Sequence, residues 1–519
     1  MRHPWDQRLG FWWIAEDRPD QPCVVACPSG STATYGQLAG SAHQLVHALR
    51  ARGLGTGDIV AYALPNDIDI LWWQLALQEA GMHAIALNPS LSPGEIRTVI
   101  EHSGAACLVL DHGYAQTADL VGASTARVKV AVGGELEGFE TYDDFVRGHP
   151  TTLPQDRVFG TPISYSSGTT GKPKAIARGG PAGDPSVLAD QMKLFGRAFQ
   201  FLPFDGVHLV SAGMHHGGCQ SFYHGALNVG QALTIMGKFD AERTLQLIEE
   251  HRVTTTYMVP TQFVRLLRLP DDVRTRYDLS SLKVVVHSAA PCPVDIKRQM
   301  MDWWGPVIWE TYGGMEGAAA IAKPHRWLER PGTVGRAVRG MGIKILDDDG
   351  NELPPGETGH VYLEPEAPTF EYRGDPELTR AVHRGRAFTL GDVGFLDEGG
   401  YLFLRDRAKD MIISGGVNIY PAEIEAVLTT HPMVNDVAVI GIPDPEWGES
   451  VKAVVELVAD AEPTTELADA LIAFCRERLA GFKCPRSVDF RPELPRTEAG
   501  KLYKRWLRDE YLGERAASS

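Results

Sequence analysis

The chain has 519 residues, of which 44% are hydrophobic and 22% are charged, and its formal net charge is -16. This is the composition of a globular protein with more than one hydrophobic core, and we expect roughly two to four structural units. The acidic balance argues against nucleic acid as the main partner, because surfaces that bind a duplex are usually basic. An anionic ligand would have to be met by cations gathered locally.

We expect neither a secretory signal nor a membrane span. Charged residues recur through residues 1–20, so the uninterrupted apolar core of a signal is missing there. The most apolar region, residues 70–88, contains charged Glu79 and is typical of a buried helix followed by a strand. The seven cysteines are scattered and odd in number, which favours reduced thiols in a cytoplasmic protein. Cys23 and Cys27 lack a second pair of ligands, so they do not predict a zinc site.

The first 300 residues alternate between helical and strand patterns. Apolar residues recur at helical spacing over 34–53 and again over 70–81, while 58–66 and 83–89 are strand-like. The same alternation returns over 244–260. It predicts parallel sheets with helical crossovers, in which ligand sites lie beyond the carboxyl ends of the strands.

Beyond this alternating region the sequence changes to short strands with tight turns. Residues 342–364 and 391–406 carry the Gly, Asp, Asn and Pro residues of hairpins. A compact segment then follows, with strands predicted within 434–458 and a helix over 466–481. The change predicts a domain boundary near residues 406–409.

Residues 164–174 read SYSSGTTGKPK, a composition suited to holding phosphate. They do not form the common nucleotide loop, because only two residues separate Gly168 from Gly171 and proline follows Lys172. Glycines nevertheless allow backbone amides to approach an anion, and the hydroxyls and lysines add donors. The stretch predicts phosphate binding in a different frame, although an ordinary Gly/Thr turn is the simpler interpretation of this stretch taken alone.

Four further motifs follow the loop in order: WETYGGMEG (309–317), LGD (390–392), RDRAKDMIISGGVNIYPAEIE (405–425) and LPRTEAGK (494–501). Together the five motifs resemble the adenylate-forming (ANL) superfamily, in the branch of the AMP-forming acyl-CoA ligases. The resemblance covers nearly the whole chain. It implies an α/β fold with two stacked, mostly parallel sheets flanked by helices, a β-barrel-like subdomain and a small mobile α+β domain at the C-terminal end. The implied bounds are 1–405 for the adenylation domain, 406–410 for a hinge and 411–519 for a lid domain.

The resemblance assigns a role in ATP binding to each motif. The loop would cradle the β- and γ-phosphates, Tyr312 would lie against the adenine, and Glu316 would bind Mg²⁺, which prefers hard oxygen ligands. Asp392 would accept hydrogen bonds from both ribose hydroxyls, with Arg407 on the other side of the sugar. The residues expected to bind ATP are Ser166, Ser167, Gly168, Thr169, Thr170, Gly171, Lys174, Ala289, Ala290, Pro291, Tyr312, Gly313, Asp392 and Arg407.

Catalysis is assigned to Lys501, together with Glu316. When a carboxylate attacks the α-phosphorus, two negative charges approach each other, and an ammonium group that bridges them stabilises the transition state. Taken alone, a lysine in a glycine turn is more often a solvated surface residue. Lys409 corresponds to the hinge residue, about which the lid would rotate between adenylation and thioester formation. Gly415, Gly416 and Trp447 are expected to line the coenzyme A channel.

The expected acid pocket departs from the usual pattern. Met315 stands where the superfamily usually has threonine, which removes a hydroxyl that would contact phosphate. Residues 214–227, MHHGGCQSFYHGAL, carry many polar side chains, which would be left unpaired along an alkyl tunnel at a cost of about 1–3 kcal/mol each. A short, polar or aromatic acid is therefore predicted, although half of these side chains could face away from the pocket. The residues expected to contact it are His216, Cys219, Gln220, Gly314 and Met315.

The leading prediction is an AMP-forming ligase that uses ATP, Mg²⁺ and coenzyme A to activate a small polar or aromatic acid. A second keeps the adenylation but transfers the group to an amine or another acceptor, and includes the activation of nitrite. A third is a catalytically silent protein that senses ATP or acyl-CoA, which the retention of Lys501, Glu316 and Asp392 argues against. The sequence does not fix the acid, the acceptor or the oligomeric state, and a homodimer is one of the states it allows.

Overall fold

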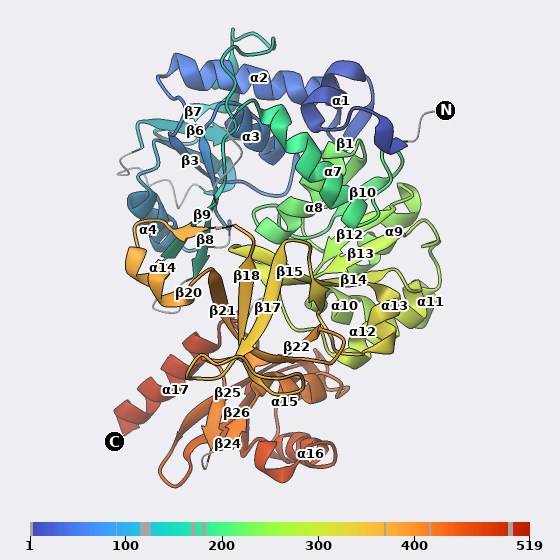
Figure 1. Ribbon diagram of the computed structural model, residues 1–519, viewed down its shortest axis with the longest axis vertical. Helices are drawn as coiled ribbons and strands as arrows, with labels where there is room; N and C mark the ends of the chain where they lie inside the picture. Colours follow the sequence, from blue (N-terminus) through green and yellow to red (C-terminus); the bar gives the residue numbers. More distant parts are fainter. Residues whose placement is uncertain are drawn as a thin grey trace.

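The computed structural model describes residues 4–89, 91–114, 126–167, 173–178, 183–367, 370–414, 417–496 and 502–518. Four sheets organise this part of the chain, and the C-terminal lobe lies below the larger N-terminal lobe (Figure 1). Within the described residues, every helix is too short or too polar to span a membrane.

A five-stranded parallel sheet forms first, in the order β4-β3-β5-β6-β7. Its central strand β3 is buried along its whole length, as its apolar run IVAYA requires. Helix α2 begins with a capping box between Thr34 and Gln37, and it confirms the predicted helix over 34–53. The elements are β3 (Ile59–Ala63), β4 (His83–Ala86), β5 (Cys107–Asp111), β6 (Val128–Val132), β7 (Glu140–Thr141), α2 (Tyr35–Ala51), α3 (Ile68–Glu79), α4 (Pro93–Ser103) and α6 (Tyr142–Val146).

The second sheet is larger, and its first half is parallel, in the order β14-β13-β12-β10-β11-β1, with β2 antiparallel at the edge. A continuous core that includes Tyr35, Trp73 and Tyr223 joins helices of both sheets. The elements are β1 (Pro22–Ala26), β2 (Thr32–Thr34), β10 (Val207–Val210), β11 (Ala232–Ile235), β12 (Thr255–Met258), β13 (Val284–His287), β14 (Ile308–Gly314), α8 (Gly217–Asn228), α9 (Ala241–Glu250), α10 (Pro260–Leu267) and α12 (Val294–Trp304).

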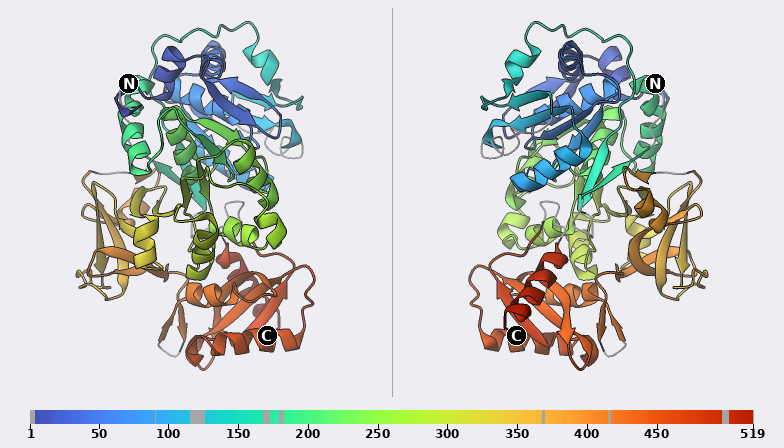
Figure 2. Two further views of the ribbon diagram at one scale, coloured as in Figure 1. Left: turned by 90° about the vertical axis from the view of Figure 1, so that its right-hand side faces the viewer. Right: turned by 90° about the vertical axis from the view of Figure 1, so that its left-hand side faces the viewer.

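The second half of this sheet is antiparallel and continues from β14 in the order β15-β16-β22-β21-β18-β17. It curls so that β17 contacts β15 and β16, and it stands to one side of the parallel sheets (Figure 2). The predicted barrel-like subdomain is this curled part, continuous with the parallel half. The elements are β15 (Gly317–Ala322), β16 (Gly335–Ala337), β17 (Met341–Leu346), β18 (Gly359–Pro365), β20 (His383–Arg384), β21 (Ala387–Leu396) and β22 (Tyr401–Arg407).

A three-stranded sheet, β19-β9-β8, lies beside the cleft described below. Its strands are β8 (Ile163–Ser167), β9 (Pro173–Ala177) and β19 (Glu371–Tyr372). The remaining helices of the N-terminal lobe are α1 (Phe11–Asp17), α7 (Leu188–Ala198), α11 (Asp271–Arg274), α13 (Pro324–Glu329) and α14 (Pro376–Val382). Short 3₁₀ turns lie at Pro4–Asp6, His112–Tyr114 and Pro185–Val187.

The C-terminal lobe has its own sheet and its own core, which includes Ile412, Ile424, Val439 and Leu471. Strand β22 ends at Arg407 and β23 begins at Ile412, so only four residues join the two lobes here. The elements are β23 (Ile412–Ser414), β24 (Val417–Ile419), β25 (Val434–Asp444), β26 (Gly448–Leu457), β27 (Ser487–Arg491), α15 (Pro421–Leu428), α16 (Thr465–Arg476), a 3₁₀ turn (Gly481–Lys483) and α17 (Lys504–Ser518).

Candidate active site

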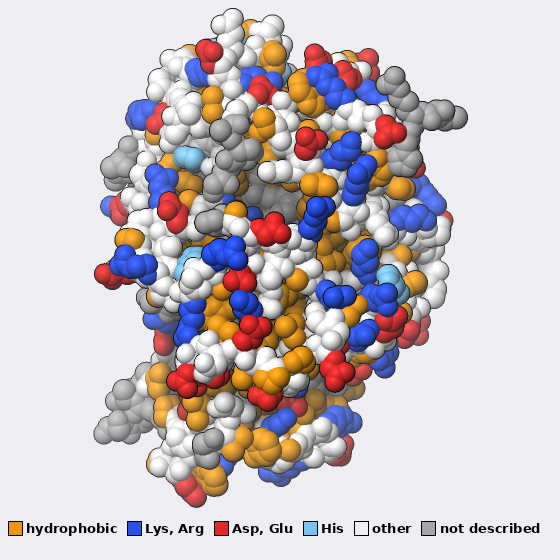
Figure 3. Space-filling model, viewed as in Figure 1, with side chains coloured by type: hydrophobic (Ala, Val, Ile, Leu, Met, Phe, Trp, Pro, Cys, Tyr) orange, Lys and Arg blue, Asp and Glu red, His pale blue; other side chains and the backbone are white. Residues whose placement is uncertain are grey.

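A continuous cleft of about 3050 Å³ lies between the lobes, at the carboxyl ends of the parallel strands. Its walls include Ser211, Val259 and Ser288, each the first residue beyond one of these strands. A pocket for one small ligand usually measures about 300–1,000 Å³, so this cleft has room for several. Basic side chains gather around the middle of the molecule on the face shown in Figure 3, although the chain as a whole is acidic. Cations that line the cleft include Lys174, Arg178, Lys238, Arg265, Arg407 and Lys409.

Asp392, Tyr312 and Arg407 form one connected group in the cleft wall. The Tyr312 hydroxyl donates to Asp392 Oδ2 at 2.6 Å, and Arg407 Nε lies 3.1 Å from Asp392 Oδ1. The antiparallel register of β21 and β22 sets Asp392 opposite Arg407, which explains how motifs far apart in sequence meet. Burial raises the pKa of Asp392, while the Arg407 charge and the Tyr312 hydrogen bond act in the opposite direction. A buried carboxylate beside an aromatic ring suits recognition of a ribose and its base.

The variant Asp392→Asn is expected to lower kcat/KM for ATP by about tenfold to a hundredfold, because a hydrogen bond to a charged group contributes about 1.5–3 kcal/mol. Steady-state kinetics at varied ATP would measure this, and KM for the acid should change much less. Glu398→Gln serves as the control, since Glu398 is an exposed carboxylate on the same segment. Unchanged ATP kinetics in the Asp392 variant would contradict the assignment.

Glu316 contacts Tyr372, whose ring lies near Lys174. The Tyr372 hydroxyl donates to Glu316 Oε1 at 2.8 Å, and Lys174 Nζ lies 5.4 Å from the centre of the Tyr372 ring. A Cβ on Gly314 would come within 2.4 Å of Glu316 Oε2, so this arrangement requires glycine there. The half-buried carboxylate fits an Mg²⁺ site by its hard oxygen donors, and Lys174, which lines the same cleft, could meet a phosphate. Tyr372 belongs to none of the sequence motifs.

The phosphate loop connects β8 to β9, whose register pairs Ser166 with Lys174 and Ser167 with Pro173. The strands therefore bring both ends of the loop together next to the cleft, where Lys174 is a lining residue. The predicted contacts of Gly168, Thr169, Thr170 and Gly171 lie outside the described residues. Their role in phosphate binding stays a prediction.

The loop after β13 contributes Ala289, Ala290 and Pro291 to the cleft wall, and their contact with ATP stays a prediction. Ala289 has φ 73°, a left-handed conformation that costs an L-residue free energy and that is found mostly at functional sites. The neighbouring Ser288 hydroxyl donates to the carbonyl of Thr311 at 2.8 Å and fixes the loop to β14. On β14 itself, a Cβ at Gly313 would come within 2.4 Å of a carbonyl oxygen of β15, so the close pairing there needs glycine.

A buried ion pair supports the strand that carries Tyr312. Lys297 Nζ of α12 lies 2.7 Å from Glu310 Oε2 of β14, and His287 Nε2 lies 3.4 Å from the same oxygen. Burial alone would raise the pKa of Glu310, but Lys297 and then His287 outweigh it and lower the pKa to about 2. The carboxylate is therefore ionised at neutral pH and depends on its partners.

The variant Lys297→Met is expected to lower the free energy of unfolding by about 3–5 kcal/mol, because Glu310 would be left buried and unpaired. Urea unfolding followed by tryptophan fluorescence would measure the loss. The double variant Lys297→Met with Glu310→Gln should recover most of it, while Arg298→Met, on the exposed side of the same helix, should have little effect. A loss in the single variant below about 1 kcal/mol would contradict this role.

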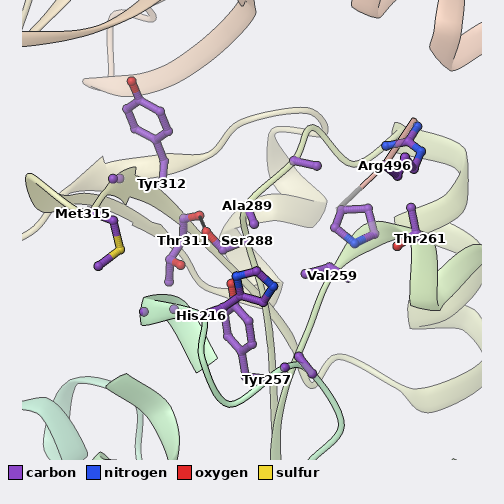
Figure 4. A pocket seen from close by; sticks show the side chains of 18 of the residues that line it. His216, Tyr257, Val259, Thr261, Ser288, Ala289, Thr311, Tyr312, Met315 and Arg496 are labelled. Atoms are coloured by element: carbon purple, nitrogen blue, oxygen red, sulfur yellow. Dashed lines mark hydrogen bonds between the residues drawn. The ribbon is translucent and has the colours of Figure 1, made fainter. Parts of the chain in front are cut away.

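Two adjacent histidines define the part of the cleft expected to hold the acid. His215 and His216 lie with ring centres 3.9 Å apart, and Figure 4 shows His216 close to Tyr257 below the loop of Ser288 and Ala289. Burial lowers the pKa of His216 to about 4. Burial and then the nearby His216 lower the pKa of His215 well below its usual value. Both imidazoles are therefore neutral at pH 7. Both ring nitrogens of His215 and Nε2 of His216 find no hydrogen-bond partner among the described residues. These nitrogen atoms are themselves buried.

Helix α8 divides its polar residues between the cleft and the core. His216, Gln220 and His224 line the cleft, whereas Cys219 is fully buried with its thiol 3.6 Å from the carbonyl of Ala212. The expectation that Cys219 contacts the acid is therefore corrected, because it lies on the opposite side of the helix. The sulfur of Met315 packs over Gly217, where a Cβ would come within 2.5 Å of it. Gly314 and Met315 both line the cleft, and their contact with the acid stays a prediction.

The segment that should carry Lys501 also reaches the cleft. Lys501 itself lies outside the described residues, but Arg496 before it and Leu502, Tyr503 and Lys504 after it line the same cavity. Figure 4 shows Arg496 beside Thr261 of the N-terminal lobe. The predicted hinge residue Lys409 is a lining residue too.

Of the residues expected to line the coenzyme A channel, Gly415 and Gly416 lie outside the described residues. Trp447 is 40% exposed and is not part of the cleft wall in this orientation of the lobes. The coenzyme A channel therefore stays a prediction, which concerns a different orientation of the two lobes.

Comparison with known proteins places this site in a family. The family model of AMP-binding enzymes matches residues 11–367, and the model of the C-terminal domain of AMP-binding enzymes matches residues 423–501. The chain is 33% identical to a feruloyl-CoA synthase from an Amycolatopsis species over 98% of this chain and 99% of that protein. It is 33% identical to an indoleacetate–CoA ligase from Aromatoleum aromaticum, over 91% of this chain and 92% of that protein.

Solved structures of similar enzymes share the fold of this chain. An anthranilate CoA ligase, AuaEII, in complex with anthranoyl-AMP superposes with a TM-score of 0.85 at 25% identity, covering 98% of this chain and 99% of that one. The amide bond synthetase McbA from Marinactinospora thermotolerans gives a TM-score of 0.81 at 27% identity, over 96% and 99% of the two chains. The family uses ATP, Mg²⁺ and coenzyme A, and the donors at Asp392 and Glu316 fit the first two. The chain belongs to the adenylate-forming superfamily, in its acyl-CoA synthetase branch.

Proposed function

We propose that this protein activates a small polar or aromatic carboxylic acid as its acyl-adenylate and transfers the acyl group to coenzyme A, with release of AMP and pyrophosphate. One observation carries the proposal: the Asp392 group, the Glu316 group, the two histidines and both flanks of Lys501 line one continuous cleft. Such a cleft can hold the acid and ATP side by side, with their reacting atoms adjacent.

In the first half-reaction a carboxylate oxygen of the acid attacks the α-phosphorus, and the bond to the pyrophosphate oxygen breaks. Asp392 and Tyr312 would hold the nucleoside, while Glu316 and Lys174 would hold the phosphates and their metal. Lys501 would bridge the carboxylate and an α-phosphate oxygen, which lowers the cost of bringing two anions together. In the second half-reaction a thiolate attacks the acyl carbon and AMP leaves.

The cleft wall favours an aromatic acid with polar substituents. Phe195, Phe199, Phe222 and Tyr257 supply aromatic surface, while His216 and Gln220 supply hydrogen-bonding groups. Apolar walls with a few placed polar groups are typical of sites that bind small ring compounds. The names of the feruloyl, indoleacetate and anthranilate ligases point to aromatic acids as well.

The test is a pyrophosphate-exchange screen over aromatic, aliphatic and dicarboxylic acids, with nitrite included. We expect the highest exchange rates with aromatic acids that carry a hydroxyl or amino group, followed by thioester formation when coenzyme A is added. Exchange with long-chain fatty acids alone would contradict the acid class. The absence of exchange with every acid would contradict the proposed activity and favour a binding protein.

A second candidate differs only in the acceptor. The structural likeness to the amide bond synthetase McbA supports transfer of the acyl group to an amine. Offering coenzyme A and a panel of amines separately to the enzyme, ATP and the best acid distinguishes the two by mass spectrometry. A thioester product supports coenzyme A, and an amide that forms without coenzyme A supports the amine.

A further inference from the structure

Arg178 is a cation of the cleft that the assigned roles leave unused. It directly follows β9, and because side chains two residues apart share a face of a strand, Lys174, Ile176 and Arg178 point to the same side. All three line the cleft. The strand thus carries one cation at its start, near the phosphate loop, and a second one further along the wall.

The hydrogen bonds of Arg178 go to neutral acceptors. Its Nε donates to the carbonyl oxygen of Met315 at 2.6 Å, and Nη2 lies 3.5 Å from the carbonyl oxygen of Gly314. Both acceptors are neutral, and among the described residues no carboxylate forms an ion pair with this guanidinium. Two of its five N–H donors are used, so three remain for a ligand.

The surroundings of Arg178 include both the cleft and the nearby charge of Glu316. Although the side chain is open to the cleft, burial by the protein around it lowers the pKa of Arg178, and the charge of Glu316 only partly opposes this effect. Because the guanidinium is open to the cleft, an anion bound there can reach it, and its planar shape suits the two oxygens of a carboxylate or phosphate.

The position of Arg178 specifies which anions can meet it. It is hydrogen-bonded to the turn formed by Gly314 and Met315, immediately before Glu316, and the Met315 side chain packs over Gly217 at the start of α8. The nucleotide phosphates would approach this turn from the side of Glu316, and the acid from the side of α8. The Met315 side chain offers no hydrogen-bond donor to the phosphates or to the acid.

We propose that Arg178 binds an oxyanion of the substrates, either a phosphate of ATP or a carboxylate of the acid. The inference rests on the proposed function, since it assigns a positioning residue to the same reaction. Replacement of Met315 would leave the hydrogen bond of Arg178 to this residue in place, because the acceptor is the backbone carbonyl.

Three variants separate charge from structural support. Arg178→Met removes both charge and donors, Arg178→Gln keeps an N–H donor for the Met315 carbonyl, and Arg178→Lys keeps the charge. Arg298→Met is the control, because Arg298 is an exposed arginine that does not line the cleft and its loss changes the net charge equally. Binding of Mg·ATP is measured by calorimetry, and pyrophosphate exchange is measured at varied ATP and at varied concentrations of the best acid.

Arg178→Met and Arg178→Gln are expected to weaken one of the two ligands by about tenfold to a hundredfold, the usual scale for a hydrogen bond to a charged group. A higher Kd for Mg·ATP identifies phosphate as the source of the oxyanion, and a higher KM for the acid alone identifies a carboxylate. Arg178→Lys should retain part of the affinity.

The proposal is overturned if both ligands bind Arg178→Gln within about twofold of the wild type, because Arg178 would then merely brace the Gly314–Met315 turn. If no acid supports exchange by the wild-type enzyme, the proposed function fails. Calorimetry with Mg·ATP then tests Arg178 independently of that function. A higher Kd for the Arg178→Gln variant supports binding of a phosphate, and a Kd within about twofold of the wild type overturns the proposal.

Discussion

Replacing Lys501 with alanine is expected to slow adenylation by roughly a hundredfold to a thousandfold, the usual effect of removing one donor that stabilises charge in a transition state. In the adenylation step two anions must come together, and the described cations that flank Lys501 in sequence are already paired. Arg496 and Lys504 line the same cleft, but Lys504 pairs with Glu425 at 2.7 Å and Arg496 pairs with Asp436. Neither is placed to substitute for Lys501.

Pyrophosphate exchange measures this loss directly. A second assay supplies a preformed acyl-adenylate together with coenzyme A, and there the variant should be close to the wild type, since the lysine acts only in the first half-reaction. This difference also shows that the variant is folded. Lys283→Ala, at an exposed position outside the cleft, is the control. A near-normal exchange rate for Lys501→Ala would refute the assignment.

The succession of elements could be predicted because local signals agree with the fold. Helix α2 begins at the Thr34–Gln37 capping box, and the predicted strands over 58–66 and 83–89 correspond to β3 and β4. What periodicity does not contain is the order of strands across a sheet. That β14 passes from parallel neighbours into an antiparallel half of the same sheet depends on contacts between distant segments.

The site was predictable as far as motifs reach. Asp392 and Arg407 were expected at the ribose and Tyr312 at the adenine, and the structure brings these three side chains together. Tyr372 and Arg178 were missed, since each acts through residues far away in sequence. The alternation of side chains along a strand, which places residues 174, 176 and 178 on one face, could have pointed to Arg178.

Cys219 was misplaced for a different reason. The positions 216, 220 and 224 and the positions 219, 223 and 226 both have helical spacing, so the sequence offers two faces of α8 without saying which one meets a cavity. In the structure the residues at positions 219, 223 and 226 face the core. A polar composition therefore predicted the character of the pocket better than its individual residues.

Replacing Lys409 with proline is expected to spare formation of the adenylate and to block formation of the thioester. The segment between β22 and β23 is a turn in which the amide of Asp410 donates to the carbonyl of Arg407 at 2.9 Å. Arg508 holds this turn through the carbonyl of Lys409 at 3.1 Å. Rotation of the lobe requires new backbone angles here, and proline fixes φ near -65°.

The present orientation is held by contacts outside this turn, which proline would leave in place. Arg268 of the N-terminal lobe donates to the carbonyl of Val434 at 2.5 Å, and Asp406 accepts from the amide of Ala422 at 2.9 Å. With these contacts retained, the flanks of Lys501 stay in the cleft. The adenylation step should therefore proceed at a rate within a few-fold of the wild type.

After rotation, a different surface of the C-terminal lobe would replace the flanks of Lys501 in the cleft. This surface is apolar and exposed. Ile413, Val417 and Trp447 are 51%, 43% and 40% exposed, and the pairing of Ser414 with Gly448 places them at one end of the small sheet. Exposed apolar side chains that gather in this way mark a surface that meets a partner or a ligand. If proline prevents the rotation, this surface stays in solvent and the thioester step stops.

Single-turnover assays of the two half-reactions test the prediction. Lys409→Ala is the matched control, because it removes the same side chain but leaves φ free, and it should support both steps. An equal loss of both steps in Lys409→Pro would count against a hinge at this residue. A selective loss of thioester formation in Lys409→Ala would instead assign the effect to the ammonium group, which lines the cleft, and not to rotation of the backbone.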